Sequence, residues 1–214
     1  MTFKAVIWDF GGVISTSPFD AFNEYEAARG LPKDFIRSVN ARNGDTNAWA
    51  LLERSEVTAD AFDALFLAEA EALGHSVPGK DVLALLSGRL RPRVVEALKT
   101  CKARGKVGYI TNNAPIGTGA GMTDDEAHAS DVAKVFALFD HVIESSKIGI
   151  RKPDPRIYAL MCEALDVEPS DCVYLDDLGI NLKPARAMGM TTIKVTGEDQ
   201  LLADLAAATG YAFG

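Results

Sequence analysis

The sequence predicts an α/β protein in which helices cover a parallel sheet and a further block of helices is inserted after the first strand. Three observations support this class. Short apolar runs recur between turn-forming residues, which is typical of strands buried on both faces. Helical periodicity lies between these runs, so strand and helix alternate along the chain. Residues 16–90 break this alternation, because they contain helical patterns alone.

Short apolar runs mark the expected strands. The first covers residues 5–8 and is stopped by Asp9 and by the glycine pair that follows Phe10. The others are expected at 107–110, 141–143, 172–175 and 191–195. These runs are short and lie between turn-forming residues, which is typical of strands in a parallel sheet covered on both faces, and the run at 141–143 is the weakest.

Helices between these strands are expected to cover the sheet. One begins after Pro92, and proline suits the first helical turn because its missing amide hydrogen is not needed there. Apolar residues recur every three or four positions, as they do on one face of a helix. They are Val94, Ala97, Leu98 and Cys101 in the first helix and Ile157, Leu160, Met161, Ala164 and Leu165 in the second, and a third helix is expected at 199–208.

The inserted block is expected to form a helical cap. Residues 1–15 and 91–214 then make up the core, and residues 16–90 make up the cap. The connecting segments at 13–20 and 87–92 are the expected hinges. A glycine-rich stretch at 117–121, followed by acidic residues, predicts a surface loop in the core.

Two helices of the cap can be located from the pattern. One follows Thr58, which can serve as its N-cap, and ends at Gly74. Its apolar stripe is Phe62, Leu65, Phe66 and Leu73, and a second helix carries Phe19, Phe22 and Tyr25. Trp49 and Phe62 are expected to pack within the cap rather than to line its inner face.

Composition excludes several classes of protein. The 214 residues are 48% apolar and 24% charged, which excludes a disordered chain and a coiled coil. A formal net charge of −8 argues against nucleic acid and against an anionic membrane as partners, and the oligomeric state stays open. No signal peptide or membrane span fits the sequence, so we expect a soluble, cytoplasmic protein. The cysteine and histidine spacings predict neither a disulfide framework nor a zinc site.

Polar residues stand where the expected strands end. Asp9 follows the first strand, Thr111 and Asn112 follow the second, Asp176 and Asp177 follow the fourth, and Lys152 precedes that strand. Ligands of open parallel sheets bind beyond the carboxyl ends of the strands, so we expect these groups to converge on one edge. Each residue alone has an ordinary role in a turn or a helix cap, and it is their coincidence that indicates chemistry.

The converging groups fit phosphoryl transfer. Asp9 and Asp177 are hard oxygen ligands that suit Mg²⁺. Lys152 can neutralise a phosphoryl group, while Thr111 and Asn112 can donate hydrogen bonds to it. Asp9 can also attack phosphorus and form an aspartyl-phosphate.

The same residues carry a resemblance to a known family. The motifs are Asp-Phe-Gly-Gly-Val-Ile at 9–14, Ile-Thr-Asn-Asn at 110–113, Arg-Lys-Pro-Asp-Pro-Arg-Ile-Tyr around Lys152, and Leu-Asp-Asp-Leu-Gly-Ile-Asn-Leu-Lys-Pro-Ala-Arg at 175–186. Together they resemble the haloacid dehalogenase superfamily over essentially the whole chain. The last two are similar to the phosphatase-type N-terminal domain of soluble epoxide hydrolase.

This resemblance implies a Rossmann-like core, Mg²⁺ and hydrolysis of a small phosphorylated molecule. It also implies a role for each residue. Asp9 would be the nucleophile and a metal ligand, Asp177 the second metal carboxylate and Gly11 a ligand through its carbonyl group; Thr111, Asn112 and Lys152 would bind phosphate, with Asp176 and Asn181 in support.

Gly11 departs from the phosphatase pattern. Phosphatases of this superfamily are expected to have an aspartate at this position, two residues after the nucleophile, as the general acid and base. General acid–base catalysis typically contributes about 10²–10⁴-fold to a rate. We therefore expect a slow phosphatase that is faster on activated aryl phosphates than on esters with poor leaving groups.

Two other functions remain open. A non-catalytic or regulatory protein that binds a phosphorylated ligand would also lack the aspartate at Gly11. A 2-haloacid dehalogenase would need no metal and would hold a carboxylate with a cap arginine, such as Arg37 or Arg42. Against the dehalogenase, the Asp176–Asp177 pair resembles a metal site, and those enzymes typically have a bulky aromatic residue in place of Gly11.

Overall fold

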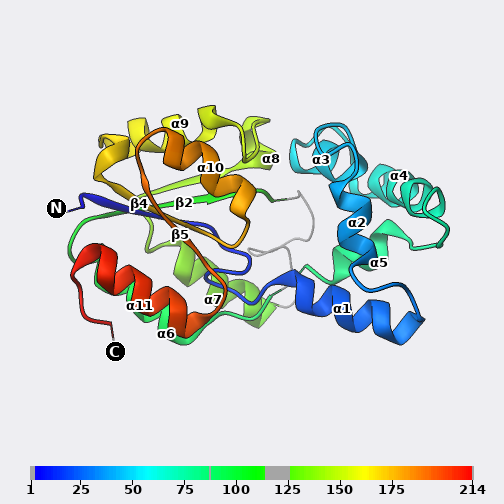
Figure 1. Ribbon diagram of the computed structural model, residues 1–214, viewed down its shortest axis with the longest axis horizontal. Coiled ribbons are helices and arrows are strands. Elements are labelled where there is room, and N and C mark those ends of the chain that lie inside the picture. The colour runs from blue at the N-terminus through cyan, green and yellow to red at the C-terminus, as the bar shows by residue number, and fades with distance from the viewer. Residues whose placement is uncertain (1–2, 87, 114–125, 214) are drawn as a thin grey trace.

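A parallel sheet forms the centre of the larger part of the molecule (Figure 1). The computed structural model describes residues 3–86, 88–113 and 126–213. Within them, the strands are β1 (Ala5–Trp8), β2 (Lys106–Thr111), β3 (His141–Glu144), β4 (Cys172–Asp176) and β5 (Thr191–Lys194). Their order is β3-β2-β1-β4-β5, and every neighbouring pair is parallel. The predicted strands and the predicted α/β class are confirmed.

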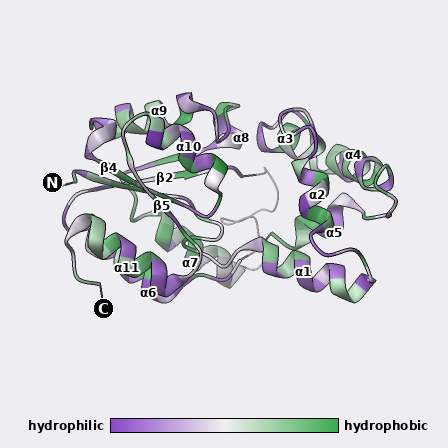
Figure 2. Ribbon diagram, in the orientation of Figure 1, coloured by the Kyte–Doolittle hydropathy of each residue, from purple (hydrophilic) through white to green (hydrophobic). Residues whose placement is uncertain are grey.

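Helices cover both faces of the sheet. One face packs against α6 (Pro92–Lys102), α7 (Glu126–Phe136) and α11 (Glu198–Thr209), and the other against α9 (Pro155–Leu165) and α10 (Gly179–Ala187). Successive residues of β1 point to opposite faces, so Val6 and Trp8 contact the first layer while Ala5 and Ile7 contact the second. Figure 2 shows hydrophobic residues on the strands and, alternating with hydrophilic ones, on the helices that cover them.

The segment between β1 and α6 forms a separate group of helices beside the sheet (Figure 1). They are α1 (Pro18–Arg29), α2 (Phe35–Ala41), α3 (Ala48–Glu53), α4 (Ala59–Glu71) and α5 (Gly79–Ala84). These helices share an apolar core of their own, which includes Phe22, Phe62 and Phe66. Thr58 caps α4 as predicted, because its side chain accepts a hydrogen bond from the amide of Ala61. We call the helices α1–α5 the cap.

Some residues assigned to apolar stripes are exposed. Leu65 and Leu160 are each 40% exposed, and Ala164 is exposed as well. Helix α4 packs through Phe62, Phe66 and Ala70, which are four residues apart and lie nearly in line, so Leu65 falls on its flank. The stripes in the sequence were therefore wider than the faces that the neighbouring elements cover.

The two connections between cap and sheet lie side by side. Ser15 and Leu90 form an antiparallel bridge, flanked by a hydrogen bond from the amide of Thr16 to the carbonyl of Arg89 (2.8 Å). These positions fall in the segments predicted as hinges, whose residue 87 lies outside the described residues. The predicted glycine-rich loop at 117–121 lies outside them too. Among the described residues, none of the helices has the length and apolar character needed to cross a membrane.

Candidate active site

Three carboxylates meet at the carboxyl edge of the sheet. Asp9 directly follows β1, Asp176 ends β4 and Asp177 comes next. Because β1 and β4 are paired in parallel, their ends lie together, and one carboxylate oxygen of each residue lies within 4.8 Å of the others. The structure therefore brings together the acidic residues that the sequence placed at separate strand ends.

Lys152 lies between two of these carboxylates. Its Nζ is 2.8 Å from Oδ1 of Asp9 and 2.8 Å from Oδ2 of Asp176, and the residue is 1% exposed. Burial opposes the charged form of the lysine, but Asp176 and Asp9 outweigh it and raise the pKa of Lys152. The lysine is therefore an ammonium ion that joins the ends of β1 and β4.

Asp176 is fully buried and surrounded by donors. The hydroxyl of Tyr174 donates to its Oδ2 (2.5 Å), the amide of Leu178 donates to its Oδ1 (2.8 Å), and the side chain of Asn181 donates to both oxygens (3.1 Å each). A carboxylate with these partners is held in one orientation. Asp176 and Asn181 therefore belong to one hydrogen-bonded group, and their supporting role at a metal site remains a prediction.

Burial raises the pKa values of the other two carboxyl groups. Burial raises the pKa of Asp9 to about 8, with Lys152 opposing the shift and Asp176 and Asp177 adding to it. Burial, and then the charge of Asp176, raise the pKa of Asp177 to about 6. Like charges at this edge thus resist full ionisation, and a cation between them would remove the conflict.

The side chain of Asn112 braces the backbone of Lys152. Its Nδ2 donates to the carbonyl of Lys152 (2.9 Å), and its Oδ1 accepts from the amide of the same residue (2.7 Å). Thr111, at the end of β2, is buried at the same edge. Asn112 therefore has a structural task that the sequence did not indicate, and its predicted contact with phosphate remains a prediction.

Gly11 and Gly12 differ in how much room they have. A Cβ atom on Gly11 would meet its nearest neighbour, Cδ of Pro18, at 3.9 Å, which is an ordinary contact. A Cβ atom on Gly12 would lie 2.5 Å from Cγ of Asp177, and the φ angle of Gly12 is +75°. The loop after β1 thus needs glycine at position 12 and tolerates a side chain at position 11.

Gly12→Ala is expected to push Asp177 out of place and to destabilise the protein by more than about 1 kcal/mol. The added methyl group would occupy the space of the Asp177 carboxylate. Calorimetric titration with Mg²⁺ should show weaker binding, and thermal unfolding should show lower stability. Gly210→Ala is the matched control, since Gly210 has a φ of +73° but nothing within 4 Å of its Cβ position. Equal Mg²⁺ binding by the wild type and Gly12→Ala would contradict the expectation.

Described residues line a cavity of about 1350 Å³ between the sheet edge and the cap. Asp9, Lys152 and Asp177 lie on the sheet side, and Phe19 and Trp49 lie on the cap side. Trp49 was expected to pack within the cap rather than to line its inner face. Its ring does pack against Phe62, with the ring centroids 5.6 Å apart, but Trp49 also lines this cavity, so the expectation was only partly right.

The two arginines that the sequence offered as carboxylate-binding residues of the cap differ in position. Arg37 lines the cavity, whereas Arg42 is exposed. The sequence did not single out Glu53, Arg151 or Ser145, which connect cap and core. A glutamate within the apolar pattern of a short helix was the one available signal for Glu53.

Comparison with known proteins identifies the family. Residues 3–189 match the model of the haloacid dehalogenase-like hydrolases. Phosphatase MT3486 of Mycobacterium tuberculosis is 31% identical over 210 residues, which cover 94% of this chain and 90% of that protein. Fold, site and relatives define a phosphatase-like hydrolase. The chain belongs to the haloacid dehalogenase-like hydrolases.

Longer proteins also contain a similar segment. Bifunctional epoxide hydrolase 2 of Sus scrofa is 31% identical over 98% of this chain, and acyl-CoA dehydrogenase family member 10 of Mus musculus is 32% identical over 98% of it. The chain spans 39% of the first protein and 19% of the second. Similarity to these relatives therefore concerns one part of each.

Solved structures share the fold. The enzyme bt-2542 of Bacteroides thetaiotaomicron, in complex with magnesium and inorganic phosphate, has a TM-score of 0.60 at 18% identity over 92% of this chain and 96% of its own. The L-2-haloacid dehalogenase of Xanthobacter autotrophicus has a TM-score of 0.61 at 20% identity over 98% of this chain and 84% of its own. Since both match equally well, the fold does not choose between their reactions.

Proposed function

We propose that this protein is a Mg²⁺-dependent phosphatase that hydrolyses a small phosphate ester through an aspartyl-phosphate on Asp9. The observation that carries the proposal is the cluster of Asp9, Asp176 and Asp177 around the buried ammonium of Lys152 at the sheet edge. Two relatives support the type of reaction by their names, phosphatase MT3486 and the sesquiterpene phosphatase astK of Aspergillus oryzae, which is 27% identical over 91% of this chain.

The donor set fits a divalent metal ion. Three carboxylates face one ammonium, so these four groups carry two excess negative charges when ionised. Oxygen donors are the ligands that Mg²⁺ prefers. Asp9, Asp177 and the carbonyl of Gly11 would hold the ion, while Asp176 is already occupied by Tyr174, Asn181 and Lys152. When bound, the ion would neutralise charge on the phosphoryl oxygens.

The residues of the chain supply the remaining steps. An oxygen of Asp9 attacks phosphorus, a bond from Asp9 to phosphorus forms, and the ester bond breaks with its electron pair on the leaving oxygen. Lys152 holds the Asp9 carboxylate in position and faces the phosphoryl group with its positive charge. Water then hydrolyses the aspartyl-phosphate, which releases phosphate and restores Asp9. Because Gly11 carries no acid, the leaving oxygen takes its proton from water or from another group.

The wild-type protein with Mg²⁺ is expected to release p-nitrophenol from p-nitrophenyl phosphate. Removal of the metal with EDTA should abolish this activity, and added Mg²⁺ should restore it, because the carboxylates cannot hold a phosphoryl anion alone. Asp9→Asn should be inactive, since an amide cannot act as the nucleophile. Asp166→Asn is the matched control, because Asp166 is exposed and its φ of 51° is one that asparagine tolerates.

Other outcomes would favour the two remaining functions. Binding of inorganic phosphate without turnover of any phosphate ester would indicate a non-catalytic, ligand-binding protein, for which the glycine at position 11 is the supporting observation. Release of chloride from 2-chloropropionate in the absence of metal would indicate a dehalogenase. Either result would overturn the proposed phosphatase.

A further inference from the structure

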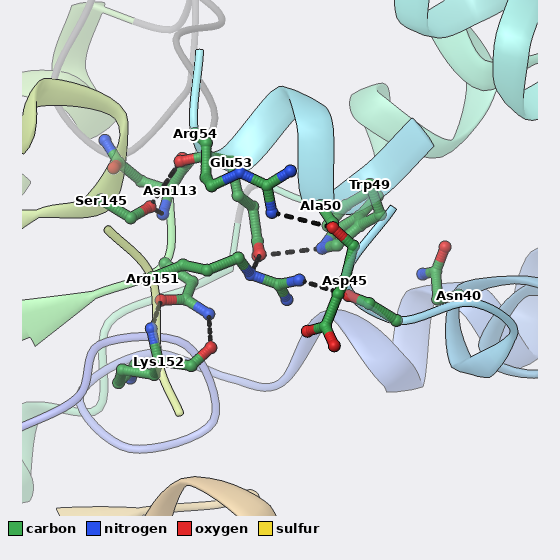
Figure 3. A network of polar contacts seen from close by, with 12 residues as sticks. Asn40, Asp45, Trp49, Ala50, Glu53, Arg54, Asn113, Ser145, Arg151 and Lys152 are labelled. Carbon is green, nitrogen blue, oxygen red and sulfur yellow. Dashed lines mark hydrogen bonds and ion pairs between the residues drawn. The ribbon is translucent and has the colours of Figure 1, made fainter. Parts of the chain in front are cut away.

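We propose that Glu53 of the cap is a positioning residue for Lys152, which it holds through two separate chains of contacts. The inference rests on the proposed function, because it assigns to Lys152 the task of binding the phosphoryl group. Figure 3 shows the network, in which Glu53 at the end of α3 lies beside Ser145, the first residue of α8 (Ser145–Ile148), and Arg151, which follows that helix.

The first chain of contacts runs through the side chain of Glu53. Glu53 is 5% exposed, and its Oε2 is 2.7 Å from Nε of Arg151, the residue before Lys152. Its Oε1 accepts a hydrogen bond from Nε1 of Trp49 (2.9 Å). Nη1 of Arg151 also donates to the carbonyl of Gly44 (2.7 Å), so the guanidinium is held by the cap at two points. The backbone beside Lys152 is thus attached to the cap.

The second chain runs through the backbone of Glu53. The hydroxyl of Ser145, which is fully buried, donates to the carbonyl of Glu53 (2.8 Å). The same hydroxyl accepts from the amide of Asn113 (3.1 Å). Asn113 follows Asn112, whose side chain braces the backbone of Lys152 by two hydrogen bonds. Both chains therefore end on the backbone of Lys152.

The position of this backbone decides where the ammonium lies. Nζ of Lys152 contacts Asp9 and Asp176 at 2.8 Å each, so a displaced backbone would lose one of these contacts or both. Charge-assisted hydrogen bonds weaken steeply with distance and angle. A cap that moves away from the sheet would release Arg151 and Ser145 together and so loosen Lys152.

Burial of a charge at this junction is costly unless the charge is paired. Burial raises the pKa of Glu53, and the guanidinium of Arg151 is the chief group that opposes the shift. An amide at position 53 would accept from Trp49 equally well without that cost. The carboxylate is therefore explained by its contact with Arg151 rather than by packing within the cap.

Glu53→Gln tests the proposal. It keeps the size of the side chain and the contact with Trp49 but removes the charge that holds Arg151. We expect calorimetric titration with inorganic phosphate, in the presence of Mg²⁺, to show affinity lowered about tenfold. The KM for p-nitrophenyl phosphate should rise by a similar factor while kcat changes less, because a displaced Lys152 binds the phosphoryl group of the substrate more weakly. A residue that only stabilised the fold would lower the melting temperature without this change in KM.

Glu56→Gln is the matched control. Glu56 is an exposed carboxylate of the cap, three residues after Glu53, and it pairs with Arg54 instead of with the core. This variant should bind phosphate as the wild type does. A Glu53→Gln variant that is folded and binds phosphate with unchanged affinity and KM would overturn the proposal.

A double-variant cycle gives an independent test. Arg151→Gln combined with Glu53→Gln should bind phosphate no more weakly than Arg151→Gln alone, because both substitutions remove the same ion pair between residues 53 and 151. If Arg151→Gln does not fold, since it leaves Glu53 buried and unpaired, the comparison of Glu53→Gln with Glu56→Gln decides the proposal by itself. Additive losses would overturn the proposal.

Failure of the proposed function has a different signature. If the wild type binds phosphate but hydrolyses no ester, the proposed phosphatase reaction is wrong, but the phosphate titrations of the Glu53 and Glu56 variants still decide whether Glu53 positions Lys152. A wild type that binds no phosphate would overturn both.

Discussion

Lys152→Met is expected to destabilise the protein by about 3–5 kcal/mol, because it leaves buried carboxylates without their cation. It is also expected to lower kcat by about 10²–10³, the usual effect of removing one charge-stabilising donor from an active site. The physical reason is the burial of the whole group. Lys152 is 1% exposed and lies 2.8 Å from both Asp9 and Asp176, so its removal leaves these two largely buried carboxylates without the positive charge that pairs with them.

Thermal or urea unfolding would measure the loss of stability, and hydrolysis of p-nitrophenyl phosphate by the folded fraction would measure kcat. Lys4→Met is the matched control, because Lys4 forms an ion pair with Asp171 at the exposed surface. Exposed pairs contribute little, so this variant should melt and hydrolyse as the wild type does. A Lys152→Met variant as stable as the control would show that the buried carboxylates do not depend on the lysine.

Gly11→Asp is expected to raise kcat on alkyl phosphates by about 10²–10⁴, the usual contribution of a general acid and base. The site has room for the change, because the nearest atom to a Cβ at position 11 is 3.9 Å away. The carbonyl group of residue 11 would remain available to the metal. The gain should be smaller on p-nitrophenyl phosphate, since p-nitrophenolate is a good leaving group and hardly needs a proton.

The measurement compares kcat on glycerol phosphate and on p-nitrophenyl phosphate for the wild type and the variant. Gly11→Asn is the control, because it has the same size as the aspartate but cannot donate or accept the proton in the same way. An equal gain with asparagine would assign the effect to packing rather than to acid catalysis. No gain on glycerol phosphate in a folded Gly11→Asp protein would show that the missing acid does not limit the reaction.

The sheet could be predicted because its signals are local. Strands buried on both faces leave continuous apolar runs, as β1 and β4 do, whereas the edge strands β3 and β5 are partly exposed and left weaker runs. Site residues could be predicted for a related reason. The carboxyl ends of parallel strands meet at one edge, so polar residues that follow the strands of the sheet must be neighbours whatever their separation in the chain. Asp9 and Asp176 are an example, since β1 and β4 are paired.

Helix faces were predicted less well than strands. Periodicity marks every apolar position, but burial depends on which neighbour covers the helix. Leu65 and Leu160 fit the helical period and are each 40% exposed, because the partners of their helices contact adjacent positions. The orientation of the Asn112 side chain could not be predicted for the same reason, since its two hydrogen bonds to the backbone of Lys152 join residues 40 positions apart.

By itself, the sequence determined the α/β class, the strands and the identity of the acidic and basic groups at their ends. Tertiary structure alone decided that Lys152 would bridge Asp9 and Asp176, that Gly11 would have room for a side chain, and that Glu53 would reach the core. The contact between Ser145 and Glu53 joins residues 92 positions apart. No local pattern encodes it, because a hydrogen bond across two packed units depends on how the cap sits on the sheet and not on the propensity of either residue.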